Sequence, residues 1–452
     1  MSRDSADVIG SDDRADVIGR VDGADIAPVD AATDANGGEA CVPSSCGARN
    51  CDTVDDGCGH TIPCGSCTAP ETCGGGGMAN VCGRSAPRPG LHYYVATTGS
   101  DSDDGSEAHP WRTIEHADGA ITVGPDGTTV HVAVGSYTGD IQTRHNGTAS
   151  ARITYVSDVR WGAVLETTTW YVQGSYVDVI GFEFRGAGRS EALGVYGSFT
   201  RVLGNFIHDM GTGCASTGAI VMPPNGYLTS HDNEASGNIV RNLAVGTTGC
   251  NQYHGIYLAG DRMIARDNVI SGVPGWGVHL WHAATRAVIT NNTIFENRQG
   301  GIIVGGDDSE GVVNDYTTVS NNIVVNNGAD AHFGIFEFGP SLGTHNTYAN
   351  NVVYANRPSD FSIASGVMPT GTVTLNATSF GGLFVDYRAD GTGDYRLHAG
   401  SAAIDVGGTT CAMGVTGCAP TVDLEGGPRP VGTALDAGAY EFGAPMAAWP
   451  YW

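Results

Sequence analysis

One short phrase recurs along the middle of the chain, and it constrains the fold more than any other feature. The phrase is an asparagine followed by two residues that are mostly apolar, and its copies lie 24 to 33 residues apart. A second phrase, a glycine that opens a short apolar run, falls between them. The asparagine copies begin at Asn205, Asn238, Asn268, Asn292, Asn322 and Asn351, and the glycine copies at Gly218, Gly255, Gly277, Gly301 and Gly334. Each unit therefore contains several strands of about four to six residues.

Strands this short cannot bury an apolar face alone, but stacked coils of them form parallel sheets around one continuous core. Asparagine tolerates a tight turn, and its side-chain amide can bond the same asparagine one coil away. The two phrases therefore predict an all-β fold, a right-handed parallel β-helix, over residues 85–442. A sandwich would not give an asparagine ladder, and a propeller needs about 40–45 residues per blade.

Eight of the 12 cysteines lie between Cys41 and Cys82, which predicts a disulfide-rich module over residues 41–84. A zinc site is the weaker interpretation, because only Cys64 and Cys67 form a CxxC pair. The acidic residues 1–40 are predicted to be a disordered linker, and 443–452 a tail. Disulfides imply an oxidising compartment, so we expect a secreted or cell-surface protein whose signal lies outside this sequence.

The charge of the chain excludes several function classes. All 22 basic residues are arginine, so no mechanism that needs a lysine is available. The formal charge of −26 makes nucleic acid an improbable partner. No run of 18 apolar residues occurs, which argues against a transmembrane segment. We expect a monomer whose partner is an extracellular polysaccharide.

Two local patterns predict specific contacts. Trp111, Ile114 and Ala117 follow helical spacing, so a short helix should cover the open first coil. Cys214 and Cys250 each lie a few residues before a glycine-led strand in consecutive coils, which predicts a disulfide between them.

The opening segment of this region is Tyr94-Val-Ala-Thr-Thr-Gly-Ser-Asp with His109-Pro-Trp-Arg-Thr-Ile, and its closing segment is Gly400-Ser-Ala-Ala-Ile-Asp with Asp436-Ala-Gly-Ala-Tyr-Glu. With the two phrases, these segments resemble the pectate-lyase-like superfamily of bacterial secreted right-handed β-helix proteins, over residues 91–442. The cysteine-rich module is similar to those of secreted myxobacterial proteins. The resemblance implies the fold, secretion and a substrate groove along the glycine-led strands, but no particular reaction.

Period-two alternation sorts the residues of the glycine-led strands. It points Ile256, Leu258 and Val278 inward, and Tyr257 and His279 outward as direct neighbours in adjacent coils. Glu337 is also turned inward, where it must be hydrogen-bonded unless a bulge rotates it into the groove. The other candidate residues near the pair are His254, His282, Trp281, Asp261, Asp307, Asp308, Arg262 and Arg298.

Three functions fit these residues. A polysaccharide lyase acting on a uronate would use Tyr257, His279, His254 and His282 for proton transfer. In that case Trp281 would stack on a sugar, and Arg262, Arg298 or a calcium ion at Asp261, Asp307 and Asp308 would hold the carboxylate. An inverting glycoside hydrolase would use Asp261 and Asp307. A non-catalytic carbohydrate-binding surface protein is the third, since outward rings are also ordinary sheet surface and GGDDSEG an ordinary turn.

Overall fold

The computed structural model describes residues 88–450, apart from Val245, Asp308 and Ala331, together with short segments between Cys46 and Gly83. The predicted linker 1–40 and most of the cysteine-rich module lie outside the described residues. Within the module, Cys46 and Cys64 form a disulfide. Two antiparallel strand pairs accompany it: β1 (Thr53–Asp55) with β2 (Thr61–Pro63), and β3 (Thr72–Cys73) with β4 (Cys82–Gly83).

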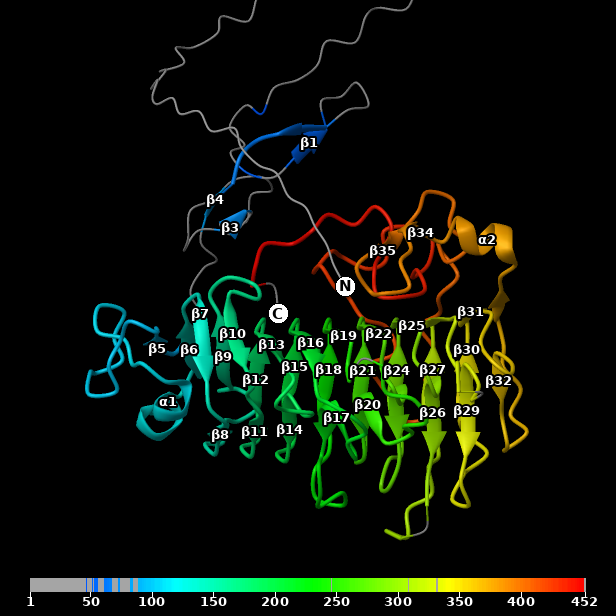
Figure 1. The fold of residues 1–452 in the computed structure, drawn as a ribbon, viewed down its shortest axis with the longest axis horizontal. Coiled ribbons are helices and arrows are strands. Elements are labelled where there is room, and N and C mark those ends of the chain that lie inside the picture. Colours follow the sequence, from blue (N-terminus) through cyan, green and yellow to red (C-terminus); the bar gives the residue numbers. More distant parts are fainter. Residues whose placement is uncertain are drawn as a thin grey trace, which may run out of the picture.

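Three long parallel sheets run side by side along the molecule, and each coil contributes one strand to each sheet (Figure 1). Sheet 1 consists of β5 (Leu91–Val95), β6 (Thr128–Val132), β9 (Ile153–Ser157), β12 (Val177–Ile180), β15 (Arg201–Leu203), β18 (Glu234–Ser236), β21 (Ile264–Arg266), β24 (Val288–Thr290), β27 (Thr318–Ser320) and β30 (Thr347–Ala349). Sheet 2 consists of β7 (Gly135–Thr138), β10 (Ala163–Glu166), β13 (Glu183–Gly186), β16 (Phe206–Met210), β19 (Ile239–Arg241), β22 (Val269–Ser271), β25 (Thr293–Phe295), β28 (Ile323–Val325), β31 (Val352–Tyr354) and β33 (Val373–Thr374). Sheet 3 consists of β8 (Ile141–Thr143), β11 (Trp170–Val172), β14 (Leu193–Val195), β17 (Thr217–Met222), β20 (Tyr253–Leu258), β23 (Trp276–Leu280), β26 (Gly300–Gly305), β29 (Ile335–Phe338) and β32 (Phe361–Ser362). The predicted parallel β-helix is confirmed.

The predicted asparagine ladder lies inside the solenoid, at the turn between sheets 1 and 2. The amide of each asparagine donates to the side-chain oxygen of the next, at 2.9–3.1 Å from Asn205 to Asn351. A second, unpredicted ladder joins Asn297, Asn327 and Asn356, with amide–oxygen distances of 2.9 and 3.0 Å. The two ladders provide hydrogen bonds for buried amide groups at the turns, which lie outside the sheets and cannot pair there. They also hold the coils in register.

The predicted helix covers the first coil. Helix α1 (Ile114–Ala120) begins after Thr113, whose side chain accepts a hydrogen bond from the His116 backbone N–H. Ile114 and Ala117 are buried against the end of the core, as is Trp111 just before the helix. The helix therefore closes the apolar end that stacked coils leave open.

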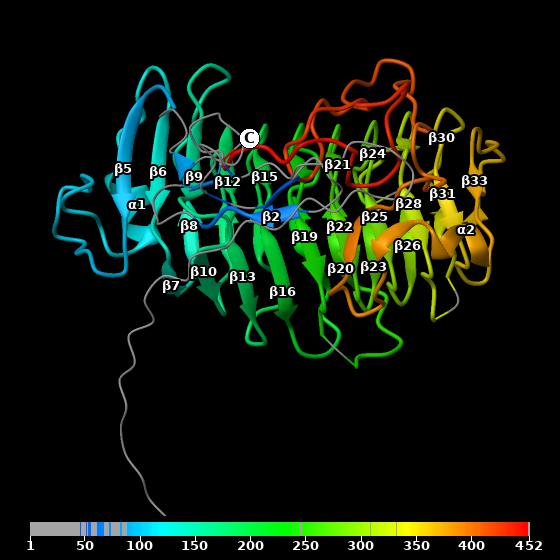
Figure 2. The ribbon, with the colours of Figure 1, turned by 90° about the horizontal axis from the view of Figure 1, so that it is seen from above.

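The C-terminal segment folds back along the outside of the solenoid, as Figures 1 and 2 both show in orange and red. It begins with α2 (Ala377–Gly381) and the antiparallel pair β34 (Phe384–Asp386) and β35 (Asp394–Leu397). Its apolar residues pack on the outer face of sheet 2, where Leu424 belongs to the same buried cluster as Phe295 and Ile323. Trp449, in the predicted tail, is buried among residues of sheet 1, and its indole N–H donates to the Ser157 carbonyl at 3.0 Å.

A buried ionic cluster fixes the end of this segment. The Arg429 guanidinium is fully buried and lies 3.0 Å from a Glu441 carboxylate oxygen and 3.2 Å from one of Asp267. It also donates to the carbonyls of Gly438 and Asp436. Burial outweighs the nearby Arg429 charge and raises the pKa of Asp267 to about 7.

Among the described residues, no helix is long and apolar enough to span a bilayer.

Candidate functional site

The outer face of sheet 3 carries the predicted site, because strand alternation sorts its side chains as expected. The inward Ile256, Leu258 and Val278 are fully buried in the core. Tyr257 on β20 pairs directly with His279 on β23, so the predicted neighbours are confirmed. Glu337 points inward, where it accepts hydrogen bonds from the Tyr348 hydroxyl at 2.6 Å and from a backbone N–H. The inward, hydrogen-bonded alternative for Glu337 is therefore the correct one.

Three rings pack together on this face. The His254 and His279 imidazoles stack with centroids 3.9 Å apart and planes 13° apart. The Tyr257 ring meets His279 edge-on at 4.7 Å, and His254 at 5.5 Å. We call His254, Tyr257 and His279 the ring cluster. Their contact arises because consecutive coils of a β-helix are only one strand spacing apart.

Burial keeps all three rings uncharged near neutral pH. It lowers the pKa of His254 to about 3 and the pKa of His279 well below its ordinary value, and it raises the pKa of Tyr257. His254 Nδ1 accepts a hydrogen bond from the Trp276 backbone N–H at 3.3 Å, which places its proton on Nε2. His279 Nδ1 has no hydrogen-bond partner among the described residues. His279 and Tyr257 both line the groove, so the ring cluster offers an uncharged imidazole and a phenol to a ligand.

The ring cluster lies on the wall of a groove of about 790 Å³ that runs across β17, β20, β23, β26 and β29. One end is aromatic: Trp276 stacks with Phe336 at 5.8 Å, Phe336 with Phe338 at 5.5 Å, and Phe338 with Trp281 at 6.1 Å. We call these four rings the aromatic platform. The predicted Trp281 is thus in the groove, together with Trp276, which sequence reasoning missed. A platform of this kind can stack against the apolar faces of sugar rings.

The other end of the groove is polar, and its residues were also missed. They include Gln252 and Glu191, whereas Gln299, also missed, lines the groove beside Trp276, where its backbone N–H donates to the Gly275 carbonyl. One oxygen of the Glu191 carboxyl accepts a hydrogen bond from the Thr217 hydroxyl at 3.2 Å, while the other is buried without a partner among the described residues. Burial raises the pKa of Glu191 to about 7, so a large fraction of this carboxyl is protonated at neutral pH.

A disulfide braces this polar end. Cys214 and Cys250 are bonded, with α-carbons 5.4 Å apart, as predicted from the coil register. The bond joins the loops that precede β17 and β20. Just beyond it, the Ser216 hydroxyl donates to the Gln252 side chain at 2.7 Å, and both residues line the groove. A second bond joins Cys411 and Cys418 in the C-terminal segment.

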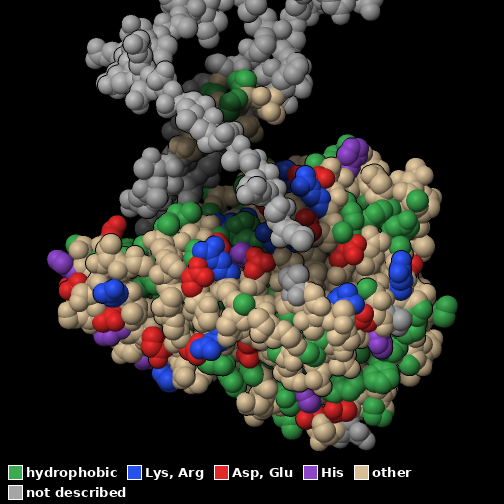
Figure 3. Space-filling view, in the orientation of Figure 1, with side chains coloured by type: hydrophobic (Ala, Val, Ile, Leu, Met, Phe, Trp, Pro, Cys, Tyr) green, Lys and Arg blue, Asp and Glu red, His purple; other side chains and the backbone are tan. Residues whose placement is uncertain are grey.

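Three of the predicted site residues lie elsewhere. Arg262 pairs with Asp232 at 2.6 Å and with Asp261, which also binds Arg286. Arg298 pairs with Asp330 at 2.6 Å. Arg262, Arg298 and Asp261 do not line the groove. Figure 3 shows the same pattern more widely, with acidic and basic side chains beside one another on the face in view. The structure thus gives these two arginines carboxylate partners within the protein.

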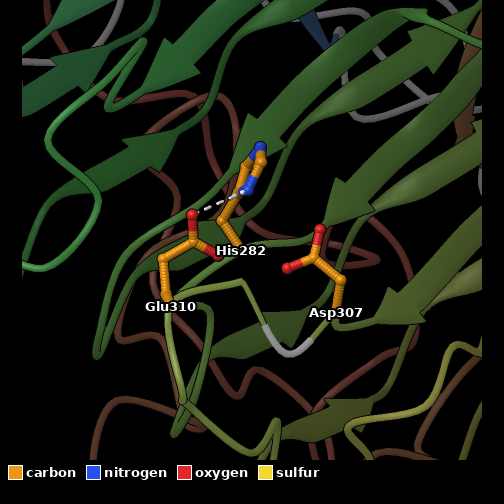
Figure 4. Close-up of side chains that lie close together, drawn as sticks. All are labelled: His282, Asp307 and Glu310. Atoms are coloured by element: carbon orange, nitrogen blue, oxygen red, sulfur yellow. Dashed lines mark ion pairs between the residues drawn. The ribbon is translucent and has the colours of Figure 1, made fainter.

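The remaining predicted residues meet at the rim of the groove. His282 follows β23, and Asp307 follows β26; Trp281 Nε1 donates to the Asp307 carboxylate at 2.8 Å. Glu310 joins them, with one oxygen 3.4 Å from His282 Nδ1 (Figure 4). We call His282, Asp307 and Glu310 the rim cluster. Asp308 lies outside the described residues. The rim cluster includes an imidazole, whereas calcium prefers oxygen ligands. Calcium at Asp261, Asp307 and Asp308 stays a prediction from the sequence.

Known proteins match this chain in sequence or in structure. Residues 192–380 match the family described as "Right handed beta helix region". The fold is similar to that of the pectate lyase Pel9A, with a TM-score of 0.51 and 17% identity over 78% of this chain and 96% of that one. A structure titled rhamnogalacturonan lyase aligns with a TM-score of 0.41 and 13% identity, over 67% of this chain and 94% of that one.

A curated sequence relative matches over a much shorter stretch. The uncharacterized protein YwoF of Bacillus subtilis (strain 168) is 35% identical over 66 residues, which span 15% of this chain and 14% of YwoF. The three parallel sheets, the family match and the structural match to Pel9A together identify the architecture. This chain is a right-handed parallel β-helix protein with the pectate-lyase-like fold.

Proposed function

We propose that this protein cleaves a uronate-containing polysaccharide by β-elimination, with the groove on sheet 3 as its active site. The observation that carries the proposal is the ring cluster: two stacked imidazoles and a tyrosine, all uncharged, on the wall of a groove large enough for sugar residues. The aromatic platform beside it suits sugar binding. The fold is also that of a protein named as a pectate lyase, which makes polyuronates the first substrates to test.

The elimination needs a base, an acid and a way to hold the carboxylate. His279 lines the groove as an uncharged imidazole, and a bound sugar carboxylate would raise the pKa of this ring, so His279 is the base for the proton on C5. The C–H electrons form the C4–C5 double bond, and the bond from C4 to the glycosidic oxygen breaks. Tyr257 protonates that oxygen, because burial keeps its hydroxyl in the acid form. The proton then returns from His279 to Tyr257.

The groove holds its substrate mainly by uncharged groups. The described lining contains no arginine, and the chain has no lysine. Gln252 and Gln299 present amide donors that can bond a carboxylate or hydroxyl, and His254 has its proton on Nε2. Trp281 and Phe338 form the stacking surface at the other end. We also place the protein outside the cell, because the disulfides Cys214–Cys250 and Cys411–Cys418 suit an oxidising compartment.

A panel of polysaccharides tests this function. The purified chain is incubated with uronate polymers and with neutral glycans, with and without EDTA. Ultraviolet absorbance reports unsaturated uronate, and a reducing-sugar assay reports chain cleavage. We expect both signals to rise together on a uronate polymer. Reducing ends without the chromophore would contradict the lyase and indicate hydrolysis. No cleavage, with binding detected by gel retardation, would indicate the non-catalytic carbohydrate-binding alternative.

Hydrolysis is the second candidate, and Glu191 is the observation that favours it. The predicted pair Asp261 and Asp307 is not assembled in the groove, but Glu191 lies there with a pKa of about 7. An inverting hydrolase needs such a protonated carboxyl as its acid. The acid form of Glu191 declines as pH rises through about 7, so hydrolysis should fall about tenfold per pH unit above that value. In Glu191→Gln the activity should be lost, whereas Glu166→Gln on sheet 2 should keep the wild-type pH profile.

A further inference from the structure

We propose that the rim cluster, made by His282, Asp307 and Glu310, binds a divalent transition-metal ion such as Zn²⁺ or Mn²⁺. Each residue offers one ligand atom, and all three atoms lie within 4.8 Å of one another. Figure 4 shows the Glu310 carboxylate beside the imidazole, with the Asp307 carboxylate facing the same space. This ligand set shares only Asp307 with the calcium set predicted from the sequence.

The distances between the ligand atoms are close to those of a site that holds a zinc ion. Ligand bonds to zinc are about 2.0–2.2 Å long, which places two ligands of one ion roughly 3.4 Å apart. His282 Nδ1 and Glu310 Oε1 are already 3.4 Å apart. The Asp307 side chain needs a shift of at most about 1.4 Å to complete the set, since no pair of ligand atoms is more than 4.8 Å apart. Side-chain rotation in the loop after β26 can supply that shift.

The state of the ligands also suits a metal. His282 Nδ1 is shielded from solvent and makes no hydrogen bond with a described residue, so its lone pair is free for coordination. The Ser309 hydroxyl also donates to Asp307 Oδ1 at 2.6 Å, so a protein donor helps to orient this carboxylate.

Neighbouring side chains hold the ligands in place. The His282 ring stacks on Tyr227 with centroids 3.8 Å apart and planes 5° apart, which fixes its orientation. Trp281 Nε1 donates to one Asp307 oxygen at 2.8 Å, and the Ser309 backbone N–H donates to the other at 3.1 Å. In metal proteins, contacts from surrounding groups of this kind orient the side chains that coordinate the ion. One imidazole with two carboxylates is a donor set that zinc and manganese accept, whereas calcium prefers six to eight oxygens.

The position of the ion gives it a role in the groove. The His282 ring lies 6.2 Å from the Tyr257 ring, and both residues line the groove. An ion with three protein ligands keeps an open position for a substrate oxygen. It would supply the positive charge that the described groove lining lacks. This role rests on the proposed function, but binding of the ion does not, so the two can fail separately.

Metal binding is measured on the full chain, untagged, not reduced, and freed of metal by EDTA and dialysis. Zn²⁺, Mn²⁺ and Ca²⁺ are titrated separately by calorimetry, with tryptophan fluorescence as a second signal because Trp281 contacts Asp307. We expect one Zn²⁺ or Mn²⁺ per chain and a fluorescence change that disappears in Trp281→Phe. His282→Ala and Glu310→Gln should each weaken binding at least tenfold, and His345→Ala, which removes the partner of Asp315, should not.

Two results would overturn the proposal. One is the absence of saturable Zn²⁺ or Mn²⁺ binding. The other is binding that stays equally tight in His282→Ala, which would place the ion elsewhere, for example in the cysteine-rich module. If the chain binds the metal at this site but cleaves no polysaccharide, the metal site is supported and the proposed reaction is rejected.

Discussion

We expect His279→Ala to lower the rate of polysaccharide cleavage at least about 100-fold, the usual loss when a general base is removed. His279 contributes the uncharged imidazole that lines the groove, and its ring centroid lies 3.9 Å from that of His254 and 4.7 Å from that of Tyr257. Its side chain points outward, so no core contact is lost. The initial rate of unsaturated uronate formation measures the effect, and circular dichroism checks that the solenoid is intact.

Two further variants make this result interpretable. Tyr257→Phe keeps the ring packing but removes the hydroxyl, so it should reduce the rate to a similar degree through loss of the acid. His345→Ala removes a histidine that is paired with Asp315 and does not line the groove, and it should keep the wild-type rate. A folded His279→Ala protein with full activity would rule out the ring cluster as the catalytic site.

Arg429→Met should lower the free energy of unfolding by about 3–5 kcal/mol, the range seen when one partner of a buried ion pair is removed. The substitution leaves the buried carboxyls of Glu441 and Asp267 without their cation. Because the pKa of Asp267 is about 7, its uncharged form tolerates the loss below that pH. The destabilisation should therefore grow as pH rises through about 7. Guanidinium denaturation at pH 5 and pH 8 measures it.

An exposed ion pair provides the matched control. Arg388 pairs with Asp386 at 2.8 Å on the surface of the same C-terminal segment. Arg388→Met should cost about 1 kcal/mol or less, as surface pairs generally do. Adding Glu441→Gln to Arg429→Met should restore part of the lost stability, since it removes one stranded charge. Equal effects of the two arginine variants would show that the buried cluster does not anchor the segment.

The sequence predicts the inside of the solenoid well, for a physical reason. Each coil repeats the same short phrase, and the Asn268 and Asn292 amides bond their counterparts one coil away. Once the register is fixed this way, the alternation of a strand decides which residues face outward. That is why Tyr257 and His279 could be placed side by side, and why the Cys214–Cys250 bond could be predicted.

The edges of the groove were harder to predict, because they lie where the repeat ends. Asp261 and Arg262 follow β20, and Arg262 adopts a positive φ of 52° at the corner, where strand alternation no longer applies. Their side chains consequently join ion pairs instead of lining the groove. Glu191 and Glu310 lie in segments of variable length outside both phrases, so no periodic signal marks them. Their positions depend on loop conformation, which a repeat does not specify.

The return path of the C-terminal segment has a mechanical consequence. In a simple stack of coils each one holds only its neighbours, so the stack can peel from either end. Here the Ala412 amide bonds the Thr318 hydroxyl on β27, while Trp449 packs on Ile180 of β12, many coils away. A single length of chain therefore ties distant coils together. Tension along the axis would be shared by the whole stack, and the coils would come apart together instead of one by one.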